Sequence, residues 1–146
     1  MKIYFAGSIT AGREYSESYK VIIGYLQKYG EVLTEHVGTV GVGGEKKEMQ
    51  FIHDRDIAWV KESDVLVGEI SVPSLGVGYE IGRAVESKKK VLCLYHQKAD
   101  KRLSAMIGGC SQIVVYRYND LTETENLIKT NKKNSSTKKY CAIKKK

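Results

Sequence analysis

Short apolar runs alternate with segments of helical periodicity along most of this chain. The runs typical of strands cover residues 3–6, 32–34, 65–70, 91–95 and 113–116. Helical spacing is found at Tyr15–Leu26, about Lys47–Glu62, Ile81–Val85 and Leu103–Ile107. Because right-handed crossovers join such units, the strands pair in parallel and helices cover both faces. The sequence therefore predicts an α/β domain with a five-stranded parallel sheet between helical layers.

The second of these helices has an amphipathic pattern. Its apolar face is expected to comprise Phe51, Ile52, Ala58 and Trp59.

The positive charge of the chain is concentrated at its C-terminal end. The 146 residues carry a net charge of +7, and eight lysines without an acid lie in residues 129–146. Subtracting these eight charges leaves −1 for residues 1–128. We therefore expect a catalytic or binding domain over 1–128 and a disordered lysine-rich tail over 129–146. The tail is either a solvated extension or a nuclear-import or weak polyanion-binding segment.

Several classes of protein are disfavoured by what the sequence lacks. No apolar run approaches membrane-spanning length, and the apolar start is too short for a signal peptide, so we expect a cytoplasmic or nuclear protein without membrane contact. The three cysteines and three histidines are not clustered, so no metal is expected. No Gly-Lys-Ser/Thr occurs, and the glycines from Gly76 to Gly82 are spaced one residue too widely for a dinucleotide fingerprint. No cofactor is predicted.

The segment from Ser74 to Glu80 is the strongest local signal for chemistry. We interpret it as a glycine-rich turn between a buried strand and a helix, with Glu80 in the first turn of that helix. The helix macrodipole favours negative charge there, so the carboxylate is expected to be ionised and able to act as a nucleophile. The alternative is an ordinary first-turn acid without a catalytic role.

Other polar residues follow the remaining strands, where ligands of parallel sheets bind. The small-residue loop from Gly7 to Arg13 offers N–H groups, hydroxyls and one cation to a phosphate, although an ordinary turn has the same composition. His36 ends the second strand and either faces the site or caps the loop. Residues 102–106 are a further anion site or a plain helix cap.

Five segments in order resemble one enzyme family. They are Phe5-Ala6-Gly7-Ser8-Ile9, residues 32–37, residues 51–56 with Trp59, residues 73–84 and residues 103–107. Together they resemble the 2′-deoxynucleoside 5′-phosphate N-hydrolases, or Rcl type, within the nucleoside 2-deoxyribosyltransferase superfamily. The resemblance runs from Ile3 to Tyr118 and does not include the tail.

This resemblance implies the mechanism of a retaining glycosidase. Glu80 would attack the anomeric carbon, Asp56 would act as acid/base or orienting group, and Tyr4 would hold the carboxylates. An oxocarbenium-like transition state would lead to a covalent glycosyl-enzyme, which water hydrolyses. The missing 2′-hydroxyl of a deoxyribose makes that transition state easier to reach.

The resemblance also implies how substrate is bound. The 5′-phosphate would be held by Gly7, Ser8, Ile9, Thr10, Arg13, Ser74 and Gly76, with Ser104 and Met106 supplied by the neighbouring subunit of a homodimer. We expect His36 and Ile52 to lie beside the base. Transferases of this superfamily tend to carry an acid where Ser74 stands, and an acid would repel a phosphate dianion.

The sequence thus predicts a Rossmann-like or flavodoxin-like three-layer sandwich with N-glycosidase activity. The expected reaction converts 2′-deoxynucleoside 5′-monophosphates to free base and 2-deoxyribose 5-phosphate. The alternatives are a nucleoside 2-deoxyribosyltransferase and a non-enzymatic nucleotide-binding sensor. Nucleic acid is expected to bind weakly, through the tail.

Overall fold

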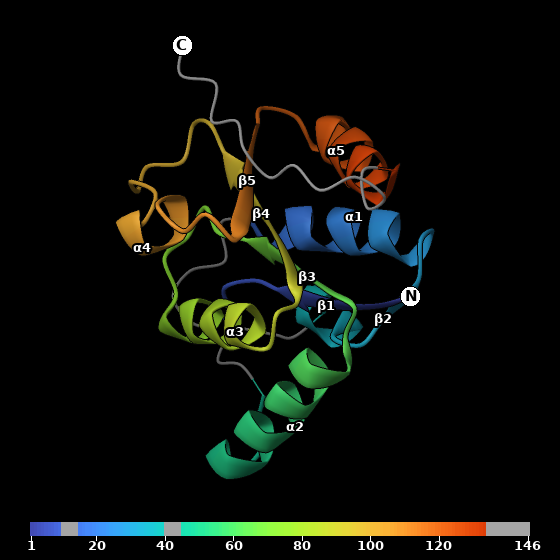
Figure 1. Ribbon diagram of the computed structural model, residues 1–146, viewed down its shortest axis with the longest axis vertical. Helices are drawn as coiled ribbons and strands as arrows, with labels where there is room; N and C mark the ends of the chain where they lie inside the picture. The colour runs from blue at the N-terminus through green and yellow to red at the C-terminus, as the bar shows by residue number, and fades with distance from the viewer. Residues whose placement is uncertain (10–14, 40–44, 134–146) are drawn as a thin grey trace.

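Five parallel strands form the sheet of this protein (Figure 1). A computed structural model describes residues 1–9, 15–39 and 45–133 of the chain. The strands are β1 (Lys2–Ala6), β2 (Glu31–Val32), β3 (Val65–Glu69), β4 (Lys90–His96) and β5 (Ile113–Tyr118). They are ordered β2-β1-β3-β4-β5, and each neighbouring pair is parallel. The predicted five-stranded parallel sheet is confirmed.

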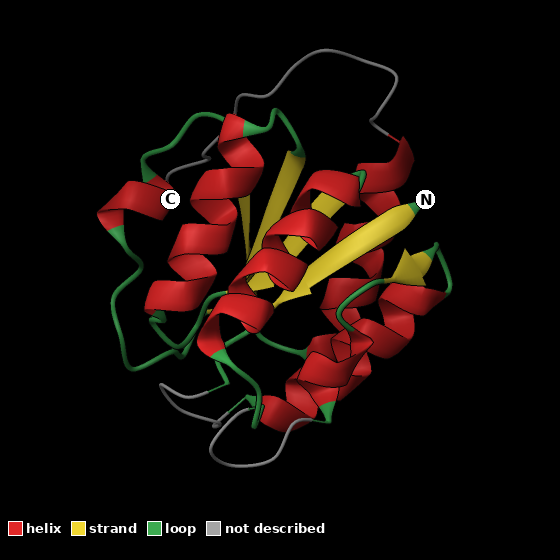
Figure 2. Cartoon of the chain, turned by 90° about the horizontal axis from the view of Figure 1, so that it is seen from below, coloured by secondary structure: helices red, strands yellow, loops and turns green. Residues whose placement is uncertain are grey.

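Helices cover both faces of the sheet (Figure 1, Figure 2). They are α1 (Ser16–Gln27), the 3-10 helix η1 (Glu35–Gly38), α2 (Met49–Glu62), α3 (Leu75–Glu86), α4 (Ala105–Gly108) and α5 (Leu121–Lys133). Helices α1 and α5 pack together on one face, and α2 and α3 pack together on the other. The predicted three-layer α/β sandwich is therefore also confirmed. Among the helices described, none is both long and apolar enough to cross a membrane.

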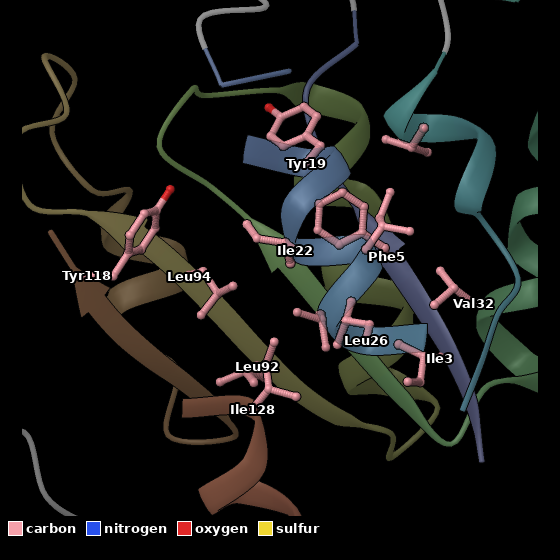
Figure 3. Packing of buried hydrophobic residues seen from close by; sticks show 13 residues of the cluster. Ile3, Phe5, Tyr19, Ile22, Leu26, Val32, Leu92, Leu94, Tyr118 and Ile128 are labelled. Carbon is pink, nitrogen blue, oxygen red and sulfur yellow. The ribbon is translucent and has the colours of Figure 1, made fainter. Parts of the chain in front are cut away.

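The core is divided by the sheet because successive strand residues point to opposite faces. On β1, Ile3 and Phe5 pack toward α1, whereas Tyr4 and Ala6 pack toward α2 and α3. Figure 3 shows the α1 side, where the ring of Tyr19 meets that of Phe5 edge-on at 5.6 Å between centroids. A tyrosine thus lies buried on each side of β1.

The second strand is shorter than predicted, because a side chain replaces its last backbone pairing. Only Glu31 and Val32 form the strand. The buried hydroxyl of Thr34 accepts a hydrogen bond from the Phe5 N–H at 2.8 Å and donates one to the Phe5 carbonyl at 2.7 Å. These bonds satisfy the backbone of β1 while the chain turns into η1.

Helix α2 buries a different face from the one predicted. Ile57 and Val60 are buried, whereas Phe51 and Ala58 are exposed, which corrects the expectation for those two residues. Trp59 and Ile52 are partly buried, as are Arg55 and Asp56. Hydrophobic periodicity failed here because the inward face of α2 carries charged side chains.

Helix α5 crosses the predicted domain boundary. It runs to Lys133, so residues 129–133, which were expected to be disordered, are helical. Ile128 is buried against α1, and lysine, which recurs in the last turns, is a good helix former. The remainder of the predicted tail, residues 134–146, lies outside the described residues.

Candidate active site

Glu80 lies one turn deeper in its helix than predicted. Helix α3 begins at Leu75, with Ser74 as its N-cap, and the Ser74 hydroxyl accepts a hydrogen bond from the Val77 N–H at 3.4 Å. The glycines at 76 and 78 are therefore helical rather than part of a turn. The N-cap and the buried face of Val77 and Ile81 outweigh the low helix propensity of glycine. Glu80 consequently falls in the second turn, beyond the strongest influence of the helix end.

The Glu80 carboxyl is harder to ionise than the sequence suggested. Burial raises its pKa to about 7, and the negative charge of Asp56 acts in the same direction. The Tyr4 hydroxyl donates a hydrogen bond to Glu80 and opposes this rise. Desolvation, and not the helix end, is therefore the largest influence on the pKa of this carboxyl.

Tyr4 provides the donor at this site from the middle of β1. Its side chain is 2% exposed and faces the layer formed by α2 and α3. Burial and then the charges of Glu80 and Asp56 raise the pKa of its phenol far above the ordinary value. Tyr4 therefore keeps its proton and acts as a hydrogen-bond donor.

Asp56 faces the same site from α2. Its pKa is raised by burial, while its neighbour Arg55 lowers it. An electrostatic interaction with His36 also lowers the pKa of Asp56, and the negative charge of Glu45 raises it. Three elements, β1, α2 and α3, thus bring one phenol and two carboxyl groups together, although the sequence separates them widely.

The predicted base-side residues lie next to this cluster. The His36 ring is 2.9 Å from a carboxylate oxygen of Glu45 and 5.7 Å from the Trp59 ring. Ile52 is partly buried on α2 and lies one helical turn before Asp56. His36 is therefore placed beside the carboxyl cluster, and Ile52 is on the same helix face as Asp56.

The loop after β1 contributes a buried hydroxyl. Ser8 is 1% exposed, and within the described chain its Oγ has no hydrogen-bond partner. Its N–H donates to the Tyr19 hydroxyl at 3.1 Å, and a Cβ at Gly7 would meet the Tyr19 ring at 3.0 Å. The Ile9 side chain packs against the α1 core cluster. Thr10 and Arg13 lie outside the described residues.

Two further predicted residues meet at the start of α3. A Cβ on Gly76 would have only the Ser74 Oγ within 4 Å among the described atoms, so the backbone there is open to a ligand. Ser74 is partly buried and already caps the helix. The hydroxyl and the open backbone form a surface that suits an anion.

Ser104 and Met106 are not part of this cluster within one chain. Both are exposed, and Met106 is 82% exposed. Ser104 precedes α4, which packs against β5, and two strands separate β5 from β1. Within the described part of the chain, neither side chain interacts with Glu80 or Asp56.

Sequence reasoning missed two charged residues beside Asp56 and a third at the end of β3. Arg55 and Glu45 form an ion pair beside Asp56, and Glu69 is fully buried at the end of β3. The Glu69 carboxylate accepts hydrogen bonds from the Tyr118 hydroxyl at 3.1 Å and from the Ser71 hydroxyl. Glu69 and Arg55 lie in predicted elements, but nothing in their spacing marked Glu69 as buried or Arg55 as partly buried.

The cluster has the groups that acid–base and nucleophilic chemistry at a carbon centre requires. One carboxyl titrates near neutral pH, a second lies close enough to influence it, and a phenol orients the first. Within residues 1–9, 15–39 and 45–133, no group of three or more His, Cys, Asp or Glu could hold a metal ion.

Comparison with known families matches nearly the whole described chain. The family model described as nucleoside 2-deoxyribosyltransferase matches residues 3–137. A 5-hydroxymethyl-dUMP N-hydrolase of Tetraodon nigroviridis is 52% identical over 113 residues, which cover 75% of this chain and 80% of the relative. A protein of the same name from Danio rerio is 48% identical over 128 residues, covering 86% of this chain and 90% of that protein.

A solved structure shares the fold. The CMP N-glycosidase BcmB of Clostridium botulinum superposes with a TM-score of 0.66 at 20% sequence identity. The match covers 90% of this chain and 99% of that structure.

Proposed function

Because this chain belongs to the nucleoside 2-deoxyribosyltransferase family, we propose that it hydrolyses the N-glycosidic bond of 2′-deoxynucleoside 5′-monophosphates. The products are the free base and 2-deoxyribose 5-phosphate. The chain is an enzyme acting on N-glycosyl compounds, as its named relatives are. The observation that carries the proposal is the cluster of Tyr4, Asp56 and Glu80 between the sheet and two helices.

In the first step, the ionised Glu80 carboxylate attacks C1′ of the sugar. The bond between C1′ and the base nitrogen breaks, its electron pair stays on the base, and Asp56 donates the proton that the leaving base needs. In the second step, Asp56 takes a proton from water, and the resulting hydroxide attacks C1′ and releases Glu80. Both steps pass through an oxocarbenium-like transition state, as in retaining glycosidases.

The environment of Glu80 supports the role of nucleophile. Its carboxylate loses solvent on burial and is therefore a stronger base and nucleophile than a free one. The hydrogen bond from Tyr4 keeps it oriented and offsets part of the cost of its charge. Because the Tyr4 phenol stays protonated, it can donate this bond throughout the reaction.

Two observations support binding of a 5′-phosphate beside this cluster. The buried Ser8 Oγ lacks a partner within the described chain, and Ser74 and Gly76 lie at the open start of α3. A dianionic phosphate would accept hydrogen bonds from these hydroxyls and N–H groups. Gly7 and Ile9 belong to the same loop as Ser8, and the proposed site also includes Thr10 and Arg13, which lie outside the described residues.

We further propose that the enzyme works as a homodimer. Met106 on α4 and Ser104 just before it are both exposed, away from the site of their own chain. In the neighbouring subunit they would reach the phosphate and complete the site. His36 and Ile52 would border the base. We propose a cytoplasmic or nuclear location, with weak nucleic-acid binding confined to the lysine-rich end.

The test is incubation of the purified protein with dGMP and with 5-hydroxymethyl-dUMP, with and without an excess of a second base. Release of free base without an acceptor supports hydrolysis. Exchange that requires the acceptor identifies a deoxyribosyltransferase instead. Binding of nucleotide without turnover of either substrate identifies a sensor, and both of these results contradict the proposal.

A further inference from the structure

The guanidinium of Arg55 lies between two carboxylates beside the proposed site. Its Nη1 and Nη2 donate to the two carboxylate oxygens of Glu45, each at 2.7 Å. Its Nε donates to Oδ1 of Asp56 at 2.9 Å, and its Nη2 lies 2.8 Å from the same oxygen. Arg55 therefore holds one particular oxygen of the Asp56 carboxyl group.

We propose that Arg55 is a positioning residue for Asp56. Two nitrogens of Arg55 hold Oδ1 of Asp56, so that Oδ2 of Asp56 is the oxygen that exchanges the proton. This inference rests on the proposed function, in which Asp56 serves as acid and base. Asp56 carries its proton on Oδ2 before the base leaves, and Oδ2 takes the proton of the attacking water afterwards. A carboxyl group free to rotate would present either oxygen, and its proton would point at the base only part of the time.

The guanidinium is itself held rigidly. The side chains of Arg55 and Glu45 are each 14% exposed, and that of Asp56 is 18% exposed. The Arg55 guanidinium carbon lies 4.7 Å from the centre of the Trp59 ring, in the geometry of a cation–π contact. Two-point hydrogen bonding to Glu45 fixes the plane of the guanidinium, which a lysine in the same place would not do.

The remaining groups that face Asp56 come from four neighbouring segments. They are Tyr4 on β1, His36 on η1, Glu45 before α2 and Glu80 on α3. Arg55 supplies the charge-assisted hydrogen bond among them, and it lowers the pKa of Asp56 against the effect of burial. Removing Arg55 is therefore expected to make Asp56 bind its proton more tightly.

Lys47 offers a matched control next to Glu45, outside the cluster of Tyr4, Asp56 and Glu80. Its Nζ lies 3.6 Å from Glu45, but no contact given for the described residues joins it to Asp56. The variant Lys47→Gln thus removes a cation beside Glu45 and leaves the hold on Oδ1 intact. The variants Arg55→Gln and Arg55→Lys both remove that hold. The first also removes the positive charge, whereas the second keeps it.

The experiment measures the Asp56 carboxyl titration by carbon-13 NMR and steady-state kinetics on dGMP at each pH. In Arg55→Gln we expect the Asp56 pKa to rise, because the hydrogen bond and the charge of Arg55 lower it, and kcat to fall at least tenfold, with KM changed less than about threefold. In Arg55→Lys we expect the titration to return toward that of the wild type while kcat stays low. Lys47→Gln should match the wild type in both.

The outcomes separate this inference from the proposed function. An unchanged Asp56 titration in Arg55→Gln, a kcat of Arg55→Lys equal to that of the wild type, or equal losses in Lys47→Gln would each overturn the positioning role. If Arg55→Gln does not fold, as judged by its thermal melt, Arg55→Lys carries the kinetic test. If the wild type cleaves no nucleotide, the proposed function fails, while the NMR titration still tests the hold of Arg55 on Asp56.

Discussion

The hydroxyl of Tyr4 donates a hydrogen bond to the carboxylate of Glu80. This contact connects the buried interior of strand β1 to helix α3, and it lowers the pKa of a carboxyl that burial raises to about 7. A phenol that never loses its proton thereby controls how readily the proposed nucleophile is formed.

Replacing Tyr4 by phenylalanine tests this relationship. Loss of a hydrogen bond to a charged group costs about 1.5–3 kcal/mol, so Tyr4→Phe should lower kcat about 10- to 100-fold. The Glu80 pKa should rise further, and the ascending limb of the pH–rate profile should move to higher pH. Steady-state rates on dGMP from pH 5 to 9 measure both effects. A profile identical to that of the wild type would contradict the proposed contact.

Glu80→Gln tests the nucleophile directly. The amide keeps the shape of the side chain and cannot attack C1′, so turnover should be abolished while nucleotide binding persists. In the wild type, kcat/KM should rise with pH through about 7, because the attacking form is the carboxylate. Isothermal titration with dGMP checks binding, and rates within tenfold of the wild type would exclude this role for Glu80.

If the proposed phosphate site is present, the enzyme should strongly prefer nucleotides to nucleosides as substrates. Hydroxyls and N–H groups gain more from a dianion than from a neutral 5′-hydroxyl, so dGMP should far exceed deoxyguanosine in kcat/KM. Ser8→Ala and Ser74→Ala should each reduce kcat/KM for dGMP by about 1–3 kcal/mol in transition-state stabilisation. Val21→Ala, at an exposed position on α1, serves as the control. Equal values of kcat/KM for dGMP and deoxyguanosine would contradict the proposed phosphate site.

We expect the buried carboxyl of Glu69 to make the folded protein less stable as the pH rises. Its pKa rises to about 7 in the folded protein because it is fully buried, although Ser71 and Tyr118 donate to it. A carboxyl whose pKa is higher in the folded than in the unfolded chain stabilises the fold fully below about pH 4.5, and this stabilisation is lost as the pH rises through about 7.

The variant Glu69→Gln should lose most of this pH dependence. Between pH 5 and 8, the difference in unfolding free energy between wild type and variant should change by up to about 3 kcal/mol, in favour of the variant at pH 8. Urea denaturation at several pH values measures the difference. Glu86→Gln, at an exposed position, should show no such change. A constant difference across this range would show that Glu69 titrates alike in both states.

The position of the domain boundary can be tested by truncation. Ending the chain after Lys133 keeps all of α5 and should leave hydrolysis and thermal stability nearly unchanged. Ending it after Ile128 removes the last turn, next to a residue buried against α1, and should lower the melting temperature. Equal melting temperatures for the two truncated chains would show that residues 129–133 contribute nothing to the fold.

The sequence alone determined most of the strands and the parallel pairing of the sheet, whereas the strand order came from the structure. Apolar runs such as 65–70 and 91–95 were strong enough to place β3 and β4 within one residue, and crossover handedness then made the sheet parallel. The prediction of strand ends was less reliable where a side chain replaces a backbone hydrogen-bond partner. At Thr34, the hydroxyl bonds to the backbone of Phe5, and β2 ends early. Sequence reasoning also missed α5, whose residues 121–128 were assigned to no helix and whose residues 129–133 were assigned to the lysine-rich tail.

The electrostatics of the site were decided by the tertiary structure. Sequence spacing and family resemblance named Tyr4, Asp56 and Glu80, and their proposed roles remain predictions. The sequence could not say that Glu80 is hard to ionise or that Arg55 holds Asp56, because a pKa depends on which groups surround a carboxyl after folding. Local periodicity determines which elements form, whereas desolvation and charge contacts arise only when β1, α2 and α3 pack together.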